Sequence, residues 1–130
     1  MSERPEDYRY TKTHEWVAPA ENGTVKIGIT DHAQSSLGDL VFVELPEVGA
    51  SFNAGDQIAV VESVKAASDI YSPVAGEVAR VNDALEDAPE QVNEDPFGEG
   101  WLFELKLESA DAADSLLGAD EYKQVADADD

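Results

Sequence analysis

Six short segments of the chain have the pattern of β-strands. Apolar residues alternate with polar or small ones along 25–30 and 101–107, a period of two that is typical of strands that bury one face, and 41–45 is rich in β-forming residues and is closed by Pro46. Glycine, proline, asparagine and aspartate separate the segments at intervals of about ten residues, which favours an all-β sandwich or barrel. The segments are 25–30, 41–45, 57–64, 68–72, 77–81 and 101–107. We therefore expect a mainly β fold.

Helical signals are short and stand between or after these segments. Thr30 or Asp31 can cap a helix over 32–37 that Gly38 would end. The segment 83–100 contains two prolines and two glycines, which favours an ordered loop or broken helical turns. From residue 109 onward, apolar residues recur at helical spacing with an interruption at Gly118, so we expect two short helices packed against the sheets.

The length and composition indicate one folded domain. The chain has 130 residues, which suits a single domain over 1–130, and we expect flexible ends at 1–9 and 126–130. Leucine, isoleucine, valine and phenylalanine make up 30 of the 130 residues, a share above the roughly 20% below which highly charged chains stay unfolded. A hydrophobic core is therefore expected despite a net charge of −21.

The strong negative charge limits the choice of partners. With 29 acidic and 8 basic residues, the chain repels nucleic-acid phosphates and anionic membrane surfaces. The start of the chain lacks the basic and apolar regions of a signal peptide, and no apolar run is long enough for a membrane span. We expect a cytoplasmic protein with no nucleic-acid or membrane partner. A high-salt habitat is one hypothesis for the acidity, because salt screens self-repulsion.

Few residue patterns suggest catalysis. The chain has no cysteine, which excludes disulfides and thiolate chemistry. The pairs 14–15 and 31–32 each join a histidine to a carboxylate, but no third ligand converges on them, so no metal site is expected. A carboxylate hydrolase is the alternative from another class, and no Ser-His-Asp order or phosphate loop supports it. Trp16 and Trp101 are expected to anchor the core.

Lys65 is the most unusual of the five lysines. It interrupts a stretch of small and apolar residues between two predicted strands, where a hairpin tip would present it to solvent. The position of Lys65 between two predicted strands does not by itself distinguish it from an ordinary surface lysine.

The residues around Lys65 resemble a known family. Residues 62–78 closely resemble the lipoyl-lysine hairpin of glycine cleavage system H proteins, and further stretches resemble the same family in the same order. These stretches are 10–17, 28–34, 37–46, 92–101 and 116–122. The resemblance implies a barrel-sandwich hybrid of two small antiparallel sheets, with short flanking and C-terminal helices, and Lys65 at an exposed hairpin tip.

The resemblance also implies a cofactor and partners. Lipoate would be joined by an amide bond to Lys65, and the chain would be a non-catalytic carrier rather than an enzyme. It would carry an aminomethyl group and reducing equivalents from glycine decarboxylase to aminomethyltransferase and dihydrolipoamide dehydrogenase, acting as a monomer. A lipoate-attaching enzyme would recognise the hairpin residues that flank Lys65. These are Glu62, Ser63, Val64 and Ala66.

By residue match, the resemblance also implies a cleft that shelters the loaded arm. Thr13, Glu15 and Asp69 are the candidates for lining it. A carboxylate there could hold a cationic amine through a charge-assisted hydrogen bond.

Three related carriers remain as alternatives. The chain could be a lipoyl domain serving 2-oxoacid dehydrogenase complexes, although no flexible linker is apparent, or it could act mainly as a lipoate donor for other enzymes. A biotin carrier fits less well, because its lysine normally lies between methionines and Lys65 lies between Val64 and Ala66.

Overall fold

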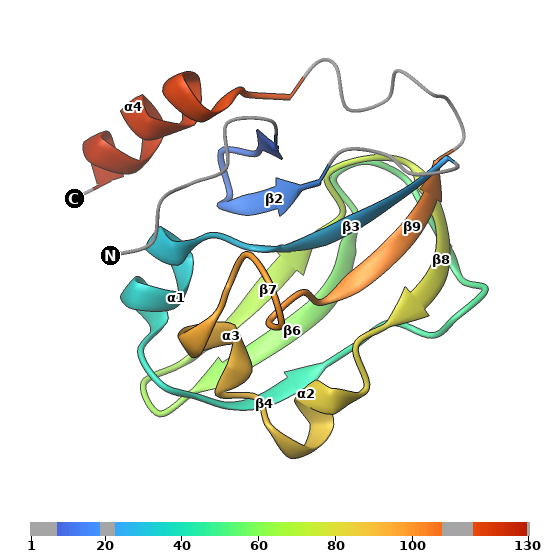
Figure 1. Ribbon diagram of the computed structural model, residues 1–130, viewed down its shortest axis with the longest axis horizontal. Coiled ribbons are helices and arrows are strands. Elements are labelled where there is room, and N and C mark those ends of the chain that lie inside the picture. The colour runs from blue at the N-terminus through green and yellow to red at the C-terminus, as the bar shows by residue number, and fades with distance from the viewer. Residues whose placement is uncertain (1–7, 19–22, 108–115, 130) are drawn as a thin grey trace.

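Two antiparallel sheets stacked as layers form the body of the protein (Figure 1). The computed structural model describes residues 8–18, 23–107 and 116–129. The larger sheet has the strand order β1-β2-β3-β9-β8-β5, and the smaller one has the order β4-β6-β7. The expected mainly β class with two antiparallel sheets and short helices is confirmed, and the two sheets are not closed into a barrel.

The strands of the larger sheet are β1 (Arg9–Tyr10), β2 (Glu15–Val17), β3 (Thr24–Ile29), β5 (Ser51–Phe52), β8 (Gly76–Val81) and β9 (Phe103–Leu107). Those of the smaller sheet are β4 (Leu40–Glu44), β6 (Gln57–Ser63) and β7 (Ala67–Tyr71). All six predicted strands are present, and the last begins at Phe103 rather than at Trp101. Strands β1, β2 and β5 were not predicted, because two or three residues are too few to show an alternation.

Four helices lie in the described part of the chain. They are α1 (Asp31–Leu37), α2 (Ala84–Asp87), α3 (Gln91–Glu94) and α4 (Ala119–Asp129). Thr30 caps α1 by accepting a hydrogen bond from the Ala33 backbone N–H at 3.2 Å, and Gly38 ends this helix with a φ of 84°. The short helices α2 and α3 confirm the broken helical turns expected over 83–100.

The C-terminal region differs in part from the prediction. One helix, α4, follows Gly118 as expected. The earlier predicted helix falls largely on residues 109–115, which lie outside the described residues, and Leu117 forms an isolated β-bridge with Tyr10 instead of a helical turn. Of the ends expected to be flexible, 1–7 and 130 are outside the described residues, Arg9 lies in β1, and Ala126 is buried within α4.

The main core lies between the two sheets. Alternate residues of β3 point inward, and Val25, Ile27 and Ile29 are all at most 2% exposed. They meet buried side chains of the smaller sheet, including Val61 and Ile70. Burying one such side chain is worth about 1.5–3 kcal/mol, so the packing of the two sheets against each other stabilises the fold.

A second, aromatic cluster joins α4 to the larger sheet. Tyr10 stacks on Tyr122 with ring centroids 4.9 Å apart, and both side chains are fully buried. Trp16 is also fully buried, and its indole N–H donates to the Pro96 carbonyl at 2.9 Å. Trp16 and Trp101 are thus both buried, as expected of core anchors. Within the described residues, no helix is long and apolar enough to cross a membrane.

Candidate functional site

The turn between β6 and β7 presents Lys65 at its tip. The two strands pair in antiparallel register up to Glu62 and Ala67. Ser63 then closes the turn: its backbone N–H donates to the Ala66 carbonyl at 2.8 Å, and its hydroxyl oxygen accepts from the N–H groups of Lys65 and Ala66 at 3.1 Å each. One serine therefore fixes the backbone on both sides of the lysine.

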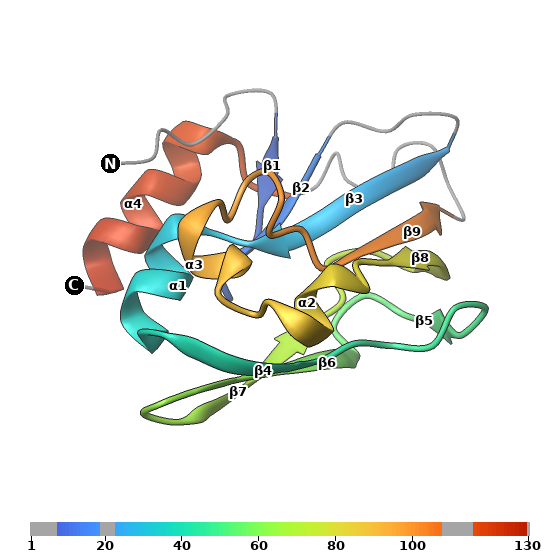
Figure 2. The same cartoon turned by 60° about the horizontal axis from the view of Figure 1, so that its bottom comes forward.

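The tip of this hairpin is open to solvent. Figure 2 shows the β6–β7 turn at the left end of the smaller sheet, below α1. Lys65, Glu62 and Ala66 are exposed, and Val64 is 69% exposed. Lys65 forms no ion pair in the part of the chain that the structure describes. An enzyme can therefore reach the amine without unfolding the turn.

The hairpin tip rests on the corner that joins α1 to β4. The Val64 N–H donates to the Asp39 carbonyl at 3.1 Å. A β-carbon added to Gly38 would lie 3.3 Å from Lys65 Cε and 3.8 Å from Lys65 Nζ. The hydrocarbon stem of the lysine thus lies against the bare backbone of Gly38.

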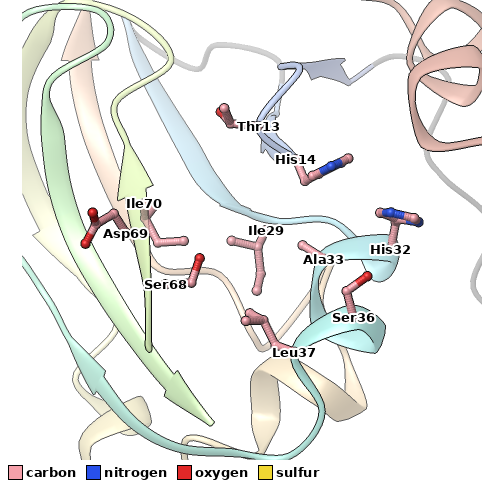
Figure 3. Close-up of a pocket in the computed structure, with 10 residues that line it drawn as sticks. All are labelled: Thr13, His14, Ile29, His32, Ala33, Ser36, Leu37, Ser68, Asp69 and Ile70. Atoms are coloured by element: carbon pink, nitrogen blue, oxygen red, sulfur yellow. The ribbon is translucent and has the colours of Figure 1, made fainter. Parts of the chain in front are cut away.

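A pocket of about 300 Å³ opens beside this corner, between α1 and β7 (Figure 3). Its apolar walls come from Ile29, Leu37 and Ile70. Figure 3 shows Ser68 and Ile70 directed toward α1, whereas the Asp69 side chain points to the other side of β7. The remaining lining residues are Thr13, His14, His32, Ala33, Ser36, Ser68 and Asp69.

A second pocket, of about 390 Å³, adjoins the first. Thr13 lines both pockets, and Glu15 and Tyr71 line only the second. The structure brings Thr13 directly to Glu15, by a hydrogen bond from the threonine hydroxyl to the carboxylate. Asp69 lines the first pocket with Thr13 but not the second pocket with Glu15. The Asp69 carboxylate instead accepts from the Gln57 side-chain amide at 3.1 Å.

Glu15 is a buried carboxyl group, only 1% exposed. Burial raises its pKa above the ordinary value of 4.5, because the charged form loses its hydration. Hydrogen bonds from the hydroxyls of Thr11 and Thr13 and from the Tyr71 N–H oppose this rise. Glu15 is thus held in place by donors while its ionisation is opposed by burial.

Sequence reasoning missed several residues of the site. Thr11 donates to Glu15 at 2.6 Å across the turn between β1 and β2, where no strand alternation exists to indicate the contact. The contact of His14 Nδ1 with the Tyr122 hydroxyl at 2.6 Å has no sequence signal, because 108 positions separate the two residues. In the described ranges, no three histidine, aspartate or glutamate residues converge as a metal site would require.

Two stacked antiparallel sheets that present a lysine at an open hairpin tip are an arrangement suited to a carrier protein. Comparison with known proteins identifies which carrier this is. The family model "Glycine cleavage H-protein" matches residues 8–129, and the chain belongs to that family.

Individual relatives agree with this assignment. The chain is 59% identical over 127 residues to the glycine cleavage system H protein of Burkholderia cenocepacia, covering 98% of this chain and 100% of the relative. It is 58% identical over 123 residues to that of Pseudoalteromonas atlantica, covering 95% of each. The crystal structure of the H protein from Mycobacterium marinum matches with a TM-score of 0.85 at 43% identity, covering 93% of this chain and 97% of that one.

Membership of this family establishes the function. The chain is the lipoate-bearing shuttle of the glycine cleavage system, with lipoate carried on a lysine, and it works with the other enzymes of that system. It is a carrier subunit and not an enzyme, and the alternative of serving 2-oxoacid dehydrogenase complexes is not favoured. The residues of the hairpin fit such a group, because the open tip offers an amine and the glycine corner leaves room for its stem.

Proposed function

We propose that Lys65 is the lysine that carries the lipoyl group. The observation that supports this choice is the turn itself, in which Ser63 fixes the backbone around Lys65 while the amine stays exposed and without an ion pair among the described residues. A fixed tip presents the amine in one orientation to the enzyme that acylates it. Orientation of this kind lowers the entropic cost of the reaction.

The lipoate-attaching enzyme would recognise the residues that flank Lys65. Glu62, Val64 and Ala66 are exposed and available for direct contact. Ser63 is half-buried and makes the hydrogen bonds of the turn, so its contribution to recognition is to set the shape of the tip. Small side chains at 66 and 67 leave the approach to the amine open.

The test is intact-mass analysis of the protein after lipoylation, with peptide mapping. Lys65→Arg keeps the positive charge but cannot form the amide, so this variant is expected to gain no lipoyl mass. Lys106→Arg is the matched control, because Lys106 is an exposed lysine on the larger sheet, and it should be modified like the unaltered chain. A lipoyl mass on Lys65→Arg, or on another lysine of the unaltered chain, would refute the assignment.

We further propose that the two pockets beside the hairpin shelter the loaded arm. The apolar walls formed by Ile29, Leu37 and Ile70 suit the hydrocarbon chain of a lipoyl group. The sulfurs of that group would carry the aminomethyl fragment. Glu15, held by Thr11 and Thr13, is the carboxyl group that would bind a cationic amine. Asp69 lines the first pocket, but its side chain points to the other side of β7, so its carboxylate would contribute only at the edge of that pocket.

We propose that a monomer of the chain presents the arm in turn to glycine decarboxylase, aminomethyltransferase and dihydrolipoamide dehydrogenase in the cytoplasm. The exposed and narrow hairpin tip supports such serial visits, because it can enter a partner's active site without rearrangement of the sheets.

A further inference from the structure

The side chain of Asn93 forms hydrogen bonds to residues on both sides of the corner between α1 and β4. Its Nδ2 donates to the Gly38 carbonyl at 2.8 Å, and its Oδ1 accepts from the Leu40 N–H at 2.9 Å. A second donation from Nδ2 reaches the Gln34 side-chain oxygen at 3.0 Å. One amide on α3 therefore fixes the residues on either side of Asp39.

The same corner supports the lysine hairpin. The Asp39 carbonyl accepts the Val64 N–H, and the Gly38 backbone lies against the stem of Lys65. Gly38 has a φ of 84°, a conformation that residues with a β-carbon rarely adopt. Each link from Asn93 to the lysine is thus a direct contact, and only the corner separates the two residues.

We propose that Asn93 is a positioning residue for the attachment lysine. Its hydrogen bonds hold the corner in place. The contacts of the corner with Val64 and Lys65 then set the direction in which the Lys65 side chain leaves the hairpin. This inference rests on the proposed function of Lys65 and extends it to a residue 28 positions away in the sequence.

The chemistry of the contact explains why an amide is needed. The corner offers one N–H donor on one side and two oxygen acceptors on the other, and only a primary amide supplies an acceptor and two hydrogen donors on adjacent atoms. An aspartate would place a carboxylate oxygen against the Gly38 carbonyl, where the contact becomes repulsive, whereas the Gln34 side-chain amide can turn and donate its own N–H. Asn93→Asp should therefore loosen the corner at almost unchanged volume.

Asn82 provides a matched control for this change. Its Nδ2 donates to the carbonyls of Glu99 and Trp101 at 2.8 Å each, and its side chain is 7% exposed. Asn82→Asp thus breaks a comparable set of hydrogen bonds elsewhere in the fold. It does not touch the corner or the hairpin.

The test uses the full chain and two measurements, at a temperature where every variant is folded. The first is kcat/KM for lipoate attachment to Lys65 by a lipoate-attaching enzyme, followed by mass spectrometry. The second is hydrogen exchange of the Val64 amide in the unlipoylated protein. We expect Asn93→Asp to lower kcat/KM by about tenfold or more, since displacements of about 1 Å can reduce rates to this degree. We expect it to speed Val64 exchange by about tenfold or more, because a loosened corner opens the hydrogen bond from the Val64 N–H to the Asp39 carbonyl more often.

Asn82→Asp should leave both quantities close to those of the unaltered chain, even where it lowers the melting temperature. If either aspartate variant fails to fold, Asn93→Ser and Asn82→Ser replace the pair with the same expectations. Unchanged attachment and exchange in the Asn93 variant would overturn the inference, and so would equal losses in both variants. A lipoyl mass on another lysine would refute the proposed function instead, while the exchange measurement would still test whether Asn93 holds the hairpin.

Discussion

Glu15 combines near-complete burial with several hydrogen-bond donors, and its ionisation therefore affects the stability of the fold. Its pKa is raised above 4.5 mainly by desolvation. The folded state thus holds the proton more tightly than the unfolded state does. The stabilisation from the protonated form is fully present below the unfolded pKa and is lost as the pH rises through the folded pKa.

Glu15→Gln removes this titration, so its effect on stability should depend on pH. The free energy of unfolding of the unaltered chain should fall, relative to that of Glu15→Gln, as the pH rises from about 4 toward 8. Chemical denaturation of both proteins across this range measures the difference. Glu77→Gln removes an exposed carboxylate on β8 and controls for the change in net charge. A Glu15→Gln difference that is independent of pH would contradict the prediction.

At the scale of elements, alternation in β3 and β9, together with β-forming residues and turn residues around the others, predicted the strands that are five residues or longer, and capping residues predicted α1. The short strands β1, β2 and β5 carry no such signal, because their pairing is set by neighbouring strands. The lysine hairpin was predictable because its residues are contiguous. The role of Asn93 was not predictable, since its partners Gln34, Gly38 and Leu40 lie 53 or more positions away and no local pattern shows them.

Tyr122 couples α4 to the site through its hydroxyl group. This group contacts His14 Nδ1 at 2.6 Å and Thr30 Oγ1 at 2.7 Å, and Thr30 in turn caps α1. Tyr122→Phe keeps the ring stacked on Tyr10 but loses both contacts, which should cost about 1–3 kcal/mol. Urea denaturation measures this cost.

Tyr71→Phe is the control for Tyr122→Phe, because the Tyr71 side chain is 36% exposed. Its free energy of unfolding should change by less than about 0.5 kcal/mol, as is usual for surface substitutions. Equal losses in the two variants would show that the buried hydroxyl has no special role in holding α4.

The whole molecule carries a net charge of −21, and this charge opposes folding through self-repulsion. We expect the melting temperature to rise when salt is increased from about 0.1 M to about 2 M, and unfolding to occur when salt is withdrawn. The Debye length already falls from about 10 Å to about 3 Å between 0.1 M and 1 M, so a screening effect should be largest in that interval and then level off.

The site of the repulsion can be tested with a charge-reduced variant. Four exposed carboxylates lie on or between α2 and α3, and replacing them with amides would lower the net negative charge while leaving the hairpin and the pockets unchanged. They are Glu86, Asp87, Glu90 and Glu94. Because repulsion is weaker in this variant, its melting temperature should be higher at low salt and should depend less on salt. A salt dependence that is equal in both proteins would mean that salt acts by exclusion from the surface, and a melting temperature that salt does not change would refute the screening hypothesis itself.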